Sequence, residues 1–253
     1  MGFDIDAVTM TGAIDHIARA IARDQGGWVL TPNLDILRQI RSSAEYHDLV
    51  ADTTLRLADG MPLVWASRLQ GTPLPERVAG SDLMLPLSER AAREGWPIFL
   101  LGGNPGAAEG AAEVVRSRAP QARIAGTECP PMGFERDDAY LNALDETLRR
   151  ANPRIVFVAL GTPKQERLIR RLRAVLPHAW FLGIGVTFSF VSGEIARAPR
   201  WMRAIGLEWA HRLVQEPGRL ARRYLVHGIP FAARLLTSAA WAGLTKPRRT
   251  ART

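Results

Sequence analysis

The chain has 253 residues, 47% hydrophobic and 23% charged, which suits one large folded domain or a core with an appendage. This composition excludes disordered and collagen-like proteins, and the single cysteine, Cys129, excludes a disulfide framework and zinc sites built on paired cysteines. The net charge of +8 is unevenly distributed: residues 197–253 carry eleven Arg and one Lys against two Glu, whereas the other 196 residues carry 21 basic and 23 acidic side chains. A near-neutral body followed by a basic region predicts an anionic partner for that region.

No segment has the pattern of a signal peptide or a membrane span. The N-terminus is acidic where a signal peptide is basic. Two long stretches without Asp, Glu, Lys, Arg or His, 95–108 and 180–193, both fall short of the roughly 18–20 residues that a spanning helix needs. We therefore expect a cytoplasmic protein that does not cross a membrane.

Short apolar runs alternate with amphipathic stretches in the first 195 residues, which predicts a parallel sheet flanked by helices. The expected strands, in chain order, are 27–30, 53–58, 97–101, 154–160 and 180–183. Two connecting stretches, 138–151 and 165–176, repeat apolar residues at helical spacing. We predict an α/β fold with a Rossmann-like sheet over 1–195, followed by a basic helical C-terminal appendage over 196–253.

Four of these strands are followed by similar turns, in which a polar residue or glycine precedes a proline near the first helical turn. The turns are Thr31-Pro32-Asn33, Asp59-Gly60-Met61-Pro62, Gly102-Gly103-Asn104-Pro105 and Gly161-Thr162-Pro163-Lys164-Gln165. Each alone is explained as a good helix start, and Thr162 with Gln165 fits a capping box. In a parallel sheet, however, all four turns lie at the carboxyl edge, where helix N-termini and glycines suit a phosphate. We expect a nucleotide or sugar phosphate over this edge.

Motifs for common cofactors are missing or incomplete. There is no P-loop, the stretch from Gly183 to Phe188 lacks the third glycine of the dinucleotide fingerprint, and the five histidines show no metal-ligand spacing. Asp4 and Asp6 resemble the metal-binding Asp-x-Asp of some sugar transferases, but they precede the first strand and are better explained as a solvated N-terminus. We expect a mechanism with neither cofactor nor metal.

Asp59 and Arg77 are the charged side chains that the pattern of the body singles out. Asp59 follows a strand and precedes a helix, so it is either an N-cap or a general base for a hydroxyl bound over the sheet edge. Arg77, in the stretch 77–82, either clamps a phosphate or pairs with a surface carboxylate. The sequence leaves both pairs of alternatives open.

The C-terminal region mixes Arg with Trp and other bulky apolar residues, and Pro217 predicts a break between short amphipathic helices. Helical spacing carried across that break would place Arg212, Arg219 and Arg223 on one face, with Arg222 beside it. Nothing resembles a module that reads bases, so nucleic acid is not expected as a partner. Cationic and apolar faces with Trp favour helices on an anionic membrane surface over a terminal hairpin with solvated arginines.

Taken together and in this order, these stretches resemble the WecG/TagA/CpsF family of bacterial glycosyltransferases over nearly the whole chain. The matching stretches are 31–33, 58–60, 77–82, 101–103, 161–166, 197–199, 206–213 and 216–220. The resemblance implies an inverting, metal-independent transfer of a sugar from a UDP-sugar to a polyprenyl-diphosphate-linked sugar. It places this reaction at the inner face of the cytoplasmic membrane, in the synthesis of a surface polysaccharide.

The resemblance also implies roles for individual residues. Asp59 would be the catalytic base, Thr31 and Asn33 would lie near the sugar, and Gln165 would bind the nucleotide. Arginines of the appendage would hold the diphosphate and would fall on Arg212, Arg219 and Arg222. The other residues that we expect to bind substrate are Arg77, Gly102, Gly103, Gly161, Pro163 and Gly185.

One departure from the family pattern bears on the donor. Many members read Phe-Asp-Phe where this chain has Phe188-Ser189-Phe190, so any role of that Asp is lost or reassigned. The donor sugar stays open among N-acetylmannosamine, its uronic acid and glucose. A homo-oligomer is compatible with the sequence.

Two other classes of function also stay open. The first is a non-catalytic module that binds a nucleotide sugar or an anionic lipid, and UDP release that depends on a lipid-linked acceptor would separate it from a transferase. The second is an enzyme that modifies a nucleotide sugar without an acceptor, such as an epimerase. That enzyme would need a redox cofactor site, which the sequence does not show.

Overall fold

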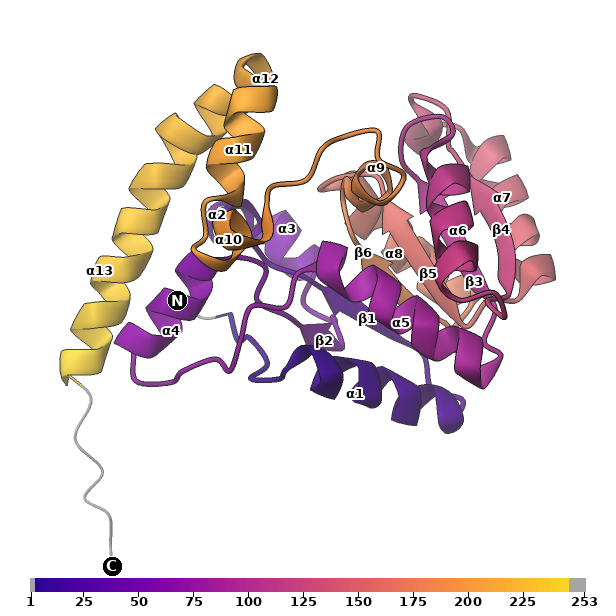
Figure 1. Cartoon of the computed structure of the whole chain (residues 1–253), viewed down its shortest axis with the longest axis horizontal. Coiled ribbons are helices and arrows are strands. Elements are labelled where there is room, and N and C mark those ends of the chain that lie inside the picture. Colours follow the sequence, from indigo (N-terminus) through magenta and orange to yellow (C-terminus); the bar gives the residue numbers. More distant parts are fainter. Residues whose placement is uncertain (1–2, 246–253) are drawn as a thin grey trace, which may run out of the picture.

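The computed structural model describes residues 3–245, except the side chains of Arg200, Ala204 and Arg219. The last basic cluster of the sequence, at 246–249, lies outside the described residues. Six strands form one sheet in the order β2-β1-β6-β5-β3-β4, and every neighbouring pair is parallel (Figure 1). The strands are β1 (Gly27–Leu30), β2 (Leu55–Arg56), β3 (Ile98–Gly102), β4 (Ile124–Glu128), β5 (Ile155–Ala159) and β6 (Trp180–Gly183).

The predicted α/β fold is confirmed, with β1 and β6 at the expected residues and β2 shorter than expected. β4 is missing from the sequence prediction. This strand lies at the edge of the sheet, all five of its residues are half-buried, and Gly126, Thr127 and Glu128 interrupt any apolar run. An edge strand of this composition lacks the continuous apolar signal of a fully buried parallel strand.

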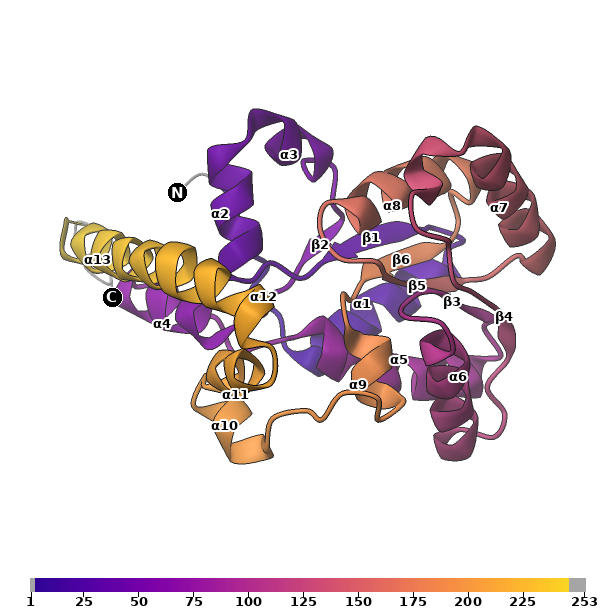
Figure 2. The same ribbon diagram turned by 90° about the horizontal axis from the view of Figure 1, so that it is seen from above.

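Helices cover both faces of the sheet, which gives three layers (Figure 2). One face is covered by α1 (Met10–Ala22), α5 (Gly80–Glu94), α6 (Ala107–Arg118) and α9 (Thr187–Val191). The other is covered by α2 (Leu34–Ser42), α3 (Ala44–Leu49), α7 (Asp138–Ala151) and α8 (Lys164–Val175), with a 3₁₀ turn at Phe134–Arg136 before α7. In β5, Ile155 and Phe157 pack on the side of α1, α5, α6 and α9. Val156 and Val158 pack on the side of α2, α3, α7 and α8, as strand alternation requires.

The helix starts after the strands are capped less uniformly than the sequence predicts. Asn33 caps α2, since its Oδ1 accepts from the backbone N–H of Asp35 at 3.0 Å and of Ile36 at 3.1 Å. No side chain caps α8, and the hydroxyl of Thr162 donates to Glu166 Oε1 at 3.0 Å. The expected capping box is therefore not formed, because the Glu166 carboxylate takes the hydroxyl that would cap the helix.

We refer to the described residues from 196 to 245 as the appendage. It contains α10 (Arg200–Ala204), α11 (Glu208–Gln215), α12 (Pro217–Ala221), a π-helical segment η2 (Arg222–Gly228) and α13 (Ile229–Thr245). As predicted, Pro217 separates two short helices, α11 and α12. Within residues 3–245, no helix is both long enough and apolar enough to span a membrane.

The appendage packs mainly on one helix of the core, α4 (Met61–Leu69), which α13 follows lengthwise (Figure 1). Leu235 and Ala239 of α13 are buried against Ala66 of α4. A Cβ on Gly243 would lie 2.1 Å from the carbonyl oxygen of Leu69, so only glycine allows α13 to approach this closely. This packing places the appendage next to α4, the helix that follows β2.

Candidate active site

A cleft of about 580 Å³ opens between the appendage and the carboxyl ends of β2, β1, β6 and β5. Eight of the residues predicted from the sequence line it: Thr31, Asn33, Asp59, Arg77, Gly161, Gln165, Gly185 and Arg212. Four others lie outside its lining: Gly102, Gly103, Pro163 and Arg222. Arg219 belongs to α12, but its side chain lies outside the described part of the structure.

The strand order explains the position of the two glycines at the end of β3, Gly102 and Gly103. The cleft spans four neighbouring strands, and β3 lies beyond the last of them, β5. Gly102 has a φ of 102°, and a Cβ there would lie 2.6 Å from the carbonyl oxygen of Ala159. Glycine at this position therefore allows the end of β3 to lie close to β5. Gly102 is thus explained by the packing of these two strands.

Asp59 follows β2 at the floor of the cleft, with 28% of its side chain exposed. Gly60 is the N-cap of α4 and no side chain caps that helix, so the capping alternative does not describe Asp59. Burial raises the pKa of Asp59 to about 7, the charge of Arg77 opposes this effect, and Glu208 and Asp82 add to it. A carboxylate that titrates near neutrality in a cleft can accept the proton of a bound hydroxyl.

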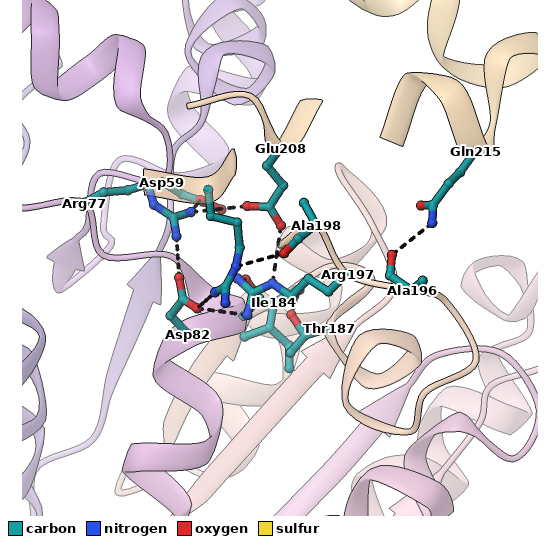
Figure 3. A network of polar contacts seen from close by, with 12 residues as sticks. Asp59, Arg77, Asp82, Ile184, Thr187, Ala196, Arg197, Ala198, Glu208 and Gln215 are labelled. Atoms are coloured by element: carbon teal, nitrogen blue, oxygen red, sulfur yellow. Dashed lines mark hydrogen bonds and ion pairs between the residues drawn. The ribbon is translucent and has the colours of Figure 1, made fainter. Parts of the chain in front are cut away.

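Arg77 lies among three carboxylates (Figure 3). Its guanidinium is 3.6 Å from Asp59, 2.5 Å from Asp82 and 3.6 Å from Glu208. Of the two alternatives that the sequence leaves open, carboxylate pairing describes these contacts, but the partners lie at the cleft and not on the outer surface. Arg77 thereby fixes the position of the Asp59 carboxylate relative to both the core and the appendage.

The same cluster fastens the start of the appendage to the core. Asp82 Oδ1 is 2.9 Å from both Arg197 and Arg203, and Arg197 Nε is 3.3 Å from Glu208 (Figure 3). Three arginines and three carboxylates balance in charge, so the cluster holds the two regions together without making the cleft strongly positive at this point. Sequence reasoning missed Asp82, Arg203 and Glu208 as site residues, because the cluster depends on contacts such as that of Asp82 with Arg203, 121 residues apart in sequence, which leave no spacing signal.

Gln165 lies across the ends of β5 and β6. Its Nε2 donates to Glu166 Oε1 at 2.9 Å, and its Oε1 accepts from the backbone N–H of Gly185 at 3.3 Å. A Cβ on Gly183 would lie 2.9 Å from Gln165 Nε2, so the glycine leaves room for the amide. Thr31 is buried beside it, and its hydroxyl donates to the carbonyl of Gly183 at 3.4 Å.

Glu166 is a buried carboxyl that sequence reasoning did not assign to the site. It is fully buried, and burial raises the pKa of this carboxyl. Its Oε1 accepts from Thr162 and Gln165, which fixes the amide orientation of Gln165 towards Gly185. Hydrogen bonds to Glu166 thus hold two residues of this edge of the cleft, Thr162 and Gln165.

The opposite side of the cleft is cationic. Arg38, Arg212 and Arg223 line it, and in the described part of the chain the buried Nε of each has no hydrogen-bond partner. The guanidinium of Arg212 lies 5.6 Å from the ring centre of Phe190, whereas Asp35 lies between the other two, 3.0 Å from Arg38 and 2.9 Å from Arg223. Unpaired buried donors carry a cost that a bound anion would remove.

Two motifs noted in the sequence lie away from the cleft. Asp6 is bound to the edge strand, where its Oδ2 accepts from the backbone N–H of Arg56 at 2.7 Å, and neither it nor Asp4 lines the cleft. Ser189 is buried outside the lining, while its neighbour Phe190 belongs to it. Among residues 3–245, no three His, Cys, Asp or Glu side chains are placed to share a metal ion.

Comparison with known proteins identifies a family and a relative. The model of the family described as "Glycosyl transferase WecG/TagA/CpsF family" matches residues 1–244. The chain is also 33% identical, over 214 residues, to the N-acetylglucosaminyldiphosphoundecaprenol N-acetyl-beta-D-mannosaminyltransferase of Bacillus subtilis (strain 168). That alignment covers 84% of this chain and 81% of the relative.

Proposed function

The chain belongs to the WecG/TagA/CpsF family of glycosyltransferases, and we propose that it moves a sugar of the N-acetylmannosamine type from a UDP-sugar to a polyprenyl-diphosphate-linked saccharide. The name of the Bacillus subtilis relative supports both halves of this proposal, since it gives a mannosaminyl group as the one transferred and a diphosphoundecaprenol-linked sugar as the acceptor. The product would be a lipid-linked intermediate of a bacterial surface polysaccharide.

The observation that carries the proposal is the position of Asp59. Its carboxylate lies in a cleft that is also lined by Gly161, Thr162 and Gln165 and by the cationic side chains of Arg212 and Arg223. With its pKa raised to about 7, Asp59 is ionised at slightly alkaline pH and is basic enough to take a proton from a hydroxyl. Among the described residues, the other carboxylates of the lining are Asp35, which lies 3.0 Å from Arg38, and Glu208, which lies 3.3 Å from Arg197.

The proposed reaction is a single displacement. Asp59 removes the proton of the acceptor hydroxyl, the hydroxyl oxygen bonds to the anomeric carbon of the donor, and the bond from that carbon to the UDP oxygen breaks. UDP leaves with the electron pair, and the anomeric configuration inverts. Contributions of general-base catalysis are typically on the order of 10²–10⁴ in rate.

The leaving diphosphate needs a positive environment. We assign this role to Arg212, which Phe190 orients, and to the backbone N–H groups at the start of α8, on the side where Gln165 would hold the nucleotide. In this proposal no metal ion takes part. Turnover should therefore survive EDTA, and loss of activity that Mn²⁺ or Mg²⁺ restores would refute this part of the proposal.

We further propose that the appendage rests on the cytoplasmic face of an anionic membrane. Its exposed bulky side chains include Trp201, Ile205, Val214 and Trp241, interspersed with arginines. Apolar side chains with Trp at the interface and nearby Arg are the features of a helix set that binds an anionic bilayer surface. The lipid-linked acceptor would then meet the cleft where it is held in the membrane.

The experiment that tests the transfer is a UDP-release assay with and without the acceptor. We expect UDP release from UDP-N-acetylmannosamine only when N-acetylglucosaminyl-diphosphoundecaprenol is present. Release without acceptor would indicate a hydrolase or an acceptor-independent enzyme, and binding without release would indicate a non-catalytic module. A thermal-shift series with UDP-N-acetylmannosamine, its uronic acid and UDP-glucose would identify the donor, because a ligand that binds only the native state raises its stability.

A further inference from the structure

A second cavity, of about 750 Å³, lies beside the cleft as a groove between α2 and α13. Arg38 and Arg41 of α2 form one wall, and Phe231, Arg234, Ser238 and Trp241 of α13 form the other. Most of the groove surface is apolar, although three arginines line it. Nothing in the proposed transfer reaction uses this groove.

The groove adjoins the cleft. Arg38 lines both cavities, and Ile229 and Ala232, from the first turn of α13, line the cleft. The groove residues of α13 follow at 231, 234, 238 and 241, a spacing that keeps them on one face of the helix. Since a helix rises about 1.5 Å per residue, this face extends about 15 Å along the helix from Phe231 to Trp241.

The junction between the two cavities is positively charged. Asp35 is the one carboxylate between the guanidiniums of Arg38 and Arg223, which leaves a net positive charge there. The Nε atoms of both arginines are buried without a hydrogen-bond partner in the described chain. Further along the groove, Arg41 and Arg234 have no carboxylate partner among the described residues. A diphosphate at the junction would accept hydrogen bonds from the unpartnered Nε–H groups of Arg38 and Arg223.

The far end of the groove lies on the exposed apolar surface. Trp241 is 71% exposed, and Leu244 in the last turn of α13 is 83% exposed. A lipid-linked acceptor must place its sugar near Asp59 while its chain stays in the bilayer, so it needs an apolar path between these two places. The groove is such a path, because the aliphatic parts of arginine side chains can line an apolar chain while their charged ends reach water.

We propose that this groove binds the first part of the isoprenoid chain of the acceptor, and that Arg38 contacts the acceptor diphosphate at its entrance. The inference rests on the proposed function and extends it. The sugar would lie in the cleft, the diphosphate between Arg38 and Arg223, and the chain along Phe231 and Ser238 towards Trp241.

The test compares two acceptors that carry the same sugar diphosphate, one on undecaprenol in mixed micelles and one on a short, soluble alkyl chain. Phe231→Ala removes an apolar wall, and Ser238→Trp fills the groove. For both variants we expect the ratio of kcat/KM for the long-chain acceptor to kcat/KM for the short-chain acceptor to fall about tenfold, which corresponds to about 1.4 kcal/mol. Met132→Ala, an exposed apolar position of the core outside both cavities, is the matched control and should leave the ratio unchanged.

Arg38→Ala is expected to lower kcat/KM for both acceptors, because both carry the diphosphate. If the wild-type protein uses both acceptors and the ratio stays within about twofold in Phe231→Ala and Ser238→Trp, the groove inference is overturned and the proposed function stands. If Phe231→Ala instead only weakens binding to acceptor-free phosphatidylglycerol vesicles, the groove belongs to a phospholipid and the inference is also overturned. If the wild-type protein releases no UDP with either acceptor, the proposed function fails, and this inference fails with it.

Discussion

The core and the appendage differ in the exposure of their large apolar side chains. The bulkiest fully buried side chains of the described chain, such as Trp28, Trp180 and Phe99, all belong to the core. Of the thirteen exposed large apolar side chains among the described residues, ten belong to the appendage. The core is thus stabilised by burial around its sheet, whereas the appendage leaves apolar surface in contact with solvent, as expected of a region that meets a membrane or a lipid.

The two regions also contribute different chemistry to the cleft. The core supplies the carboxylate of Asp59 and the edge around Gln165, and the appendage supplies Arg212 and Arg223. The ion pairs around Asp82 hold the two together. Under the proposed function each region would have a separable role: the core would bind the nucleotide sugar and remove a proton, and the appendage would bind phosphate and lipid.

The largest expected effect comes from the core. Asp59→Asn should lower kcat by about 10²–10⁴ while the Kd for the UDP-sugar changes little, because the amide keeps the shape of the side chain but is not a base. Steady-state kinetics together with calorimetric titration of the donor would measure this. Asp52→Asn is the matched control, since Asp52 is exposed and pairs with Arg173 away from the cleft. Activity of Asp59→Asn within threefold of wild type would remove Asp59 from the role of base.

The second largest effect on activity is expected in the appendage, where replacement of two adjacent arginines should have different consequences. Arg223 lines the cleft and Arg222 does not, although family resemblance assigns the diphosphate role to Arg222. We expect Arg223→Ala to lower kcat/KM by about 10–100-fold, since a charge-assisted contact to a phosphate is lost, and Arg222→Ala to change it far less. The kinetics of both variants with one acceptor measure the difference. The reverse order of effects would mean that the π-helical segment has another register in the active state.

The pH dependence should follow the core residue. A general base must be ionised, so kcat/KM should fall about tenfold per pH unit below the pKa of Asp59, which is about 7, and level off above it. The stability of the fold should change with pH in the opposite direction to the activity. The pKa of Asp59 is raised in the folded state from its ordinary value of 3.8, so stability falls as pH rises from about 4 to about 7.

Asp59→Asn lacks this titration, and its melting temperature relative to wild type should therefore rise between pH 5 and pH 8. Thermal unfolding of both proteins at the two pH values measures the change. A pH-rate profile with no acid limb near 7, together with a melting difference that does not depend on pH, would contradict the environment described for Asp59.

The smallest expected effect is on binding to anionic vesicles, through exposed apolar side chains. Trp201→Ala in the appendage should weaken binding to anionic vesicles severalfold, whereas Met132→Ala in the core, at a side chain that is 98% exposed, should not. Added salt should weaken binding of the wild type, because each basic residue near the membrane contributes about 1 kcal/mol and salt screens that attraction. Sedimentation with vesicles measures both. Equal losses in the two variants would mean that the appendage is not the membrane-facing region.

The sequence predicts the core side of the cleft well, for a physical reason. Residues that follow parallel strands meet at one edge, so the chain order of strands and turns is enough to group Thr31, Asp59 and Gly161. The strand order cannot be predicted in this way, and it decides that Gly102 lies beyond the cleft. The half-buried β4 has no apolar run, so its sequence carries no strand signal.

The appendage side is predicted less completely. The spacing of eleven residues between Arg212 and Arg223 indicates one helical face, and both line the cleft. Arg38 carries no signal in the sequence, because its role depends on α13 lying beside α2. The partners of Arg77 are also set by tertiary packing, since Glu208 reaches it from a region 131 residues further along the chain. Local patterns identify an edge or a face, but not what is packed against it.

The most direct test of the account compares the full chain with a chain that ends after residue 195, on a soluble acceptor that needs no membrane. If the core binds the nucleotide and the appendage completes the site, the shortened chain should stay folded and bind UDP but transfer sugar at least about a hundredfold more slowly. Circular dichroism and a UDP thermal shift check the first two points, and UDP release measures the third. Equal rates of transfer for the two chains would contradict the account, because the appendage would then serve only as a membrane anchor.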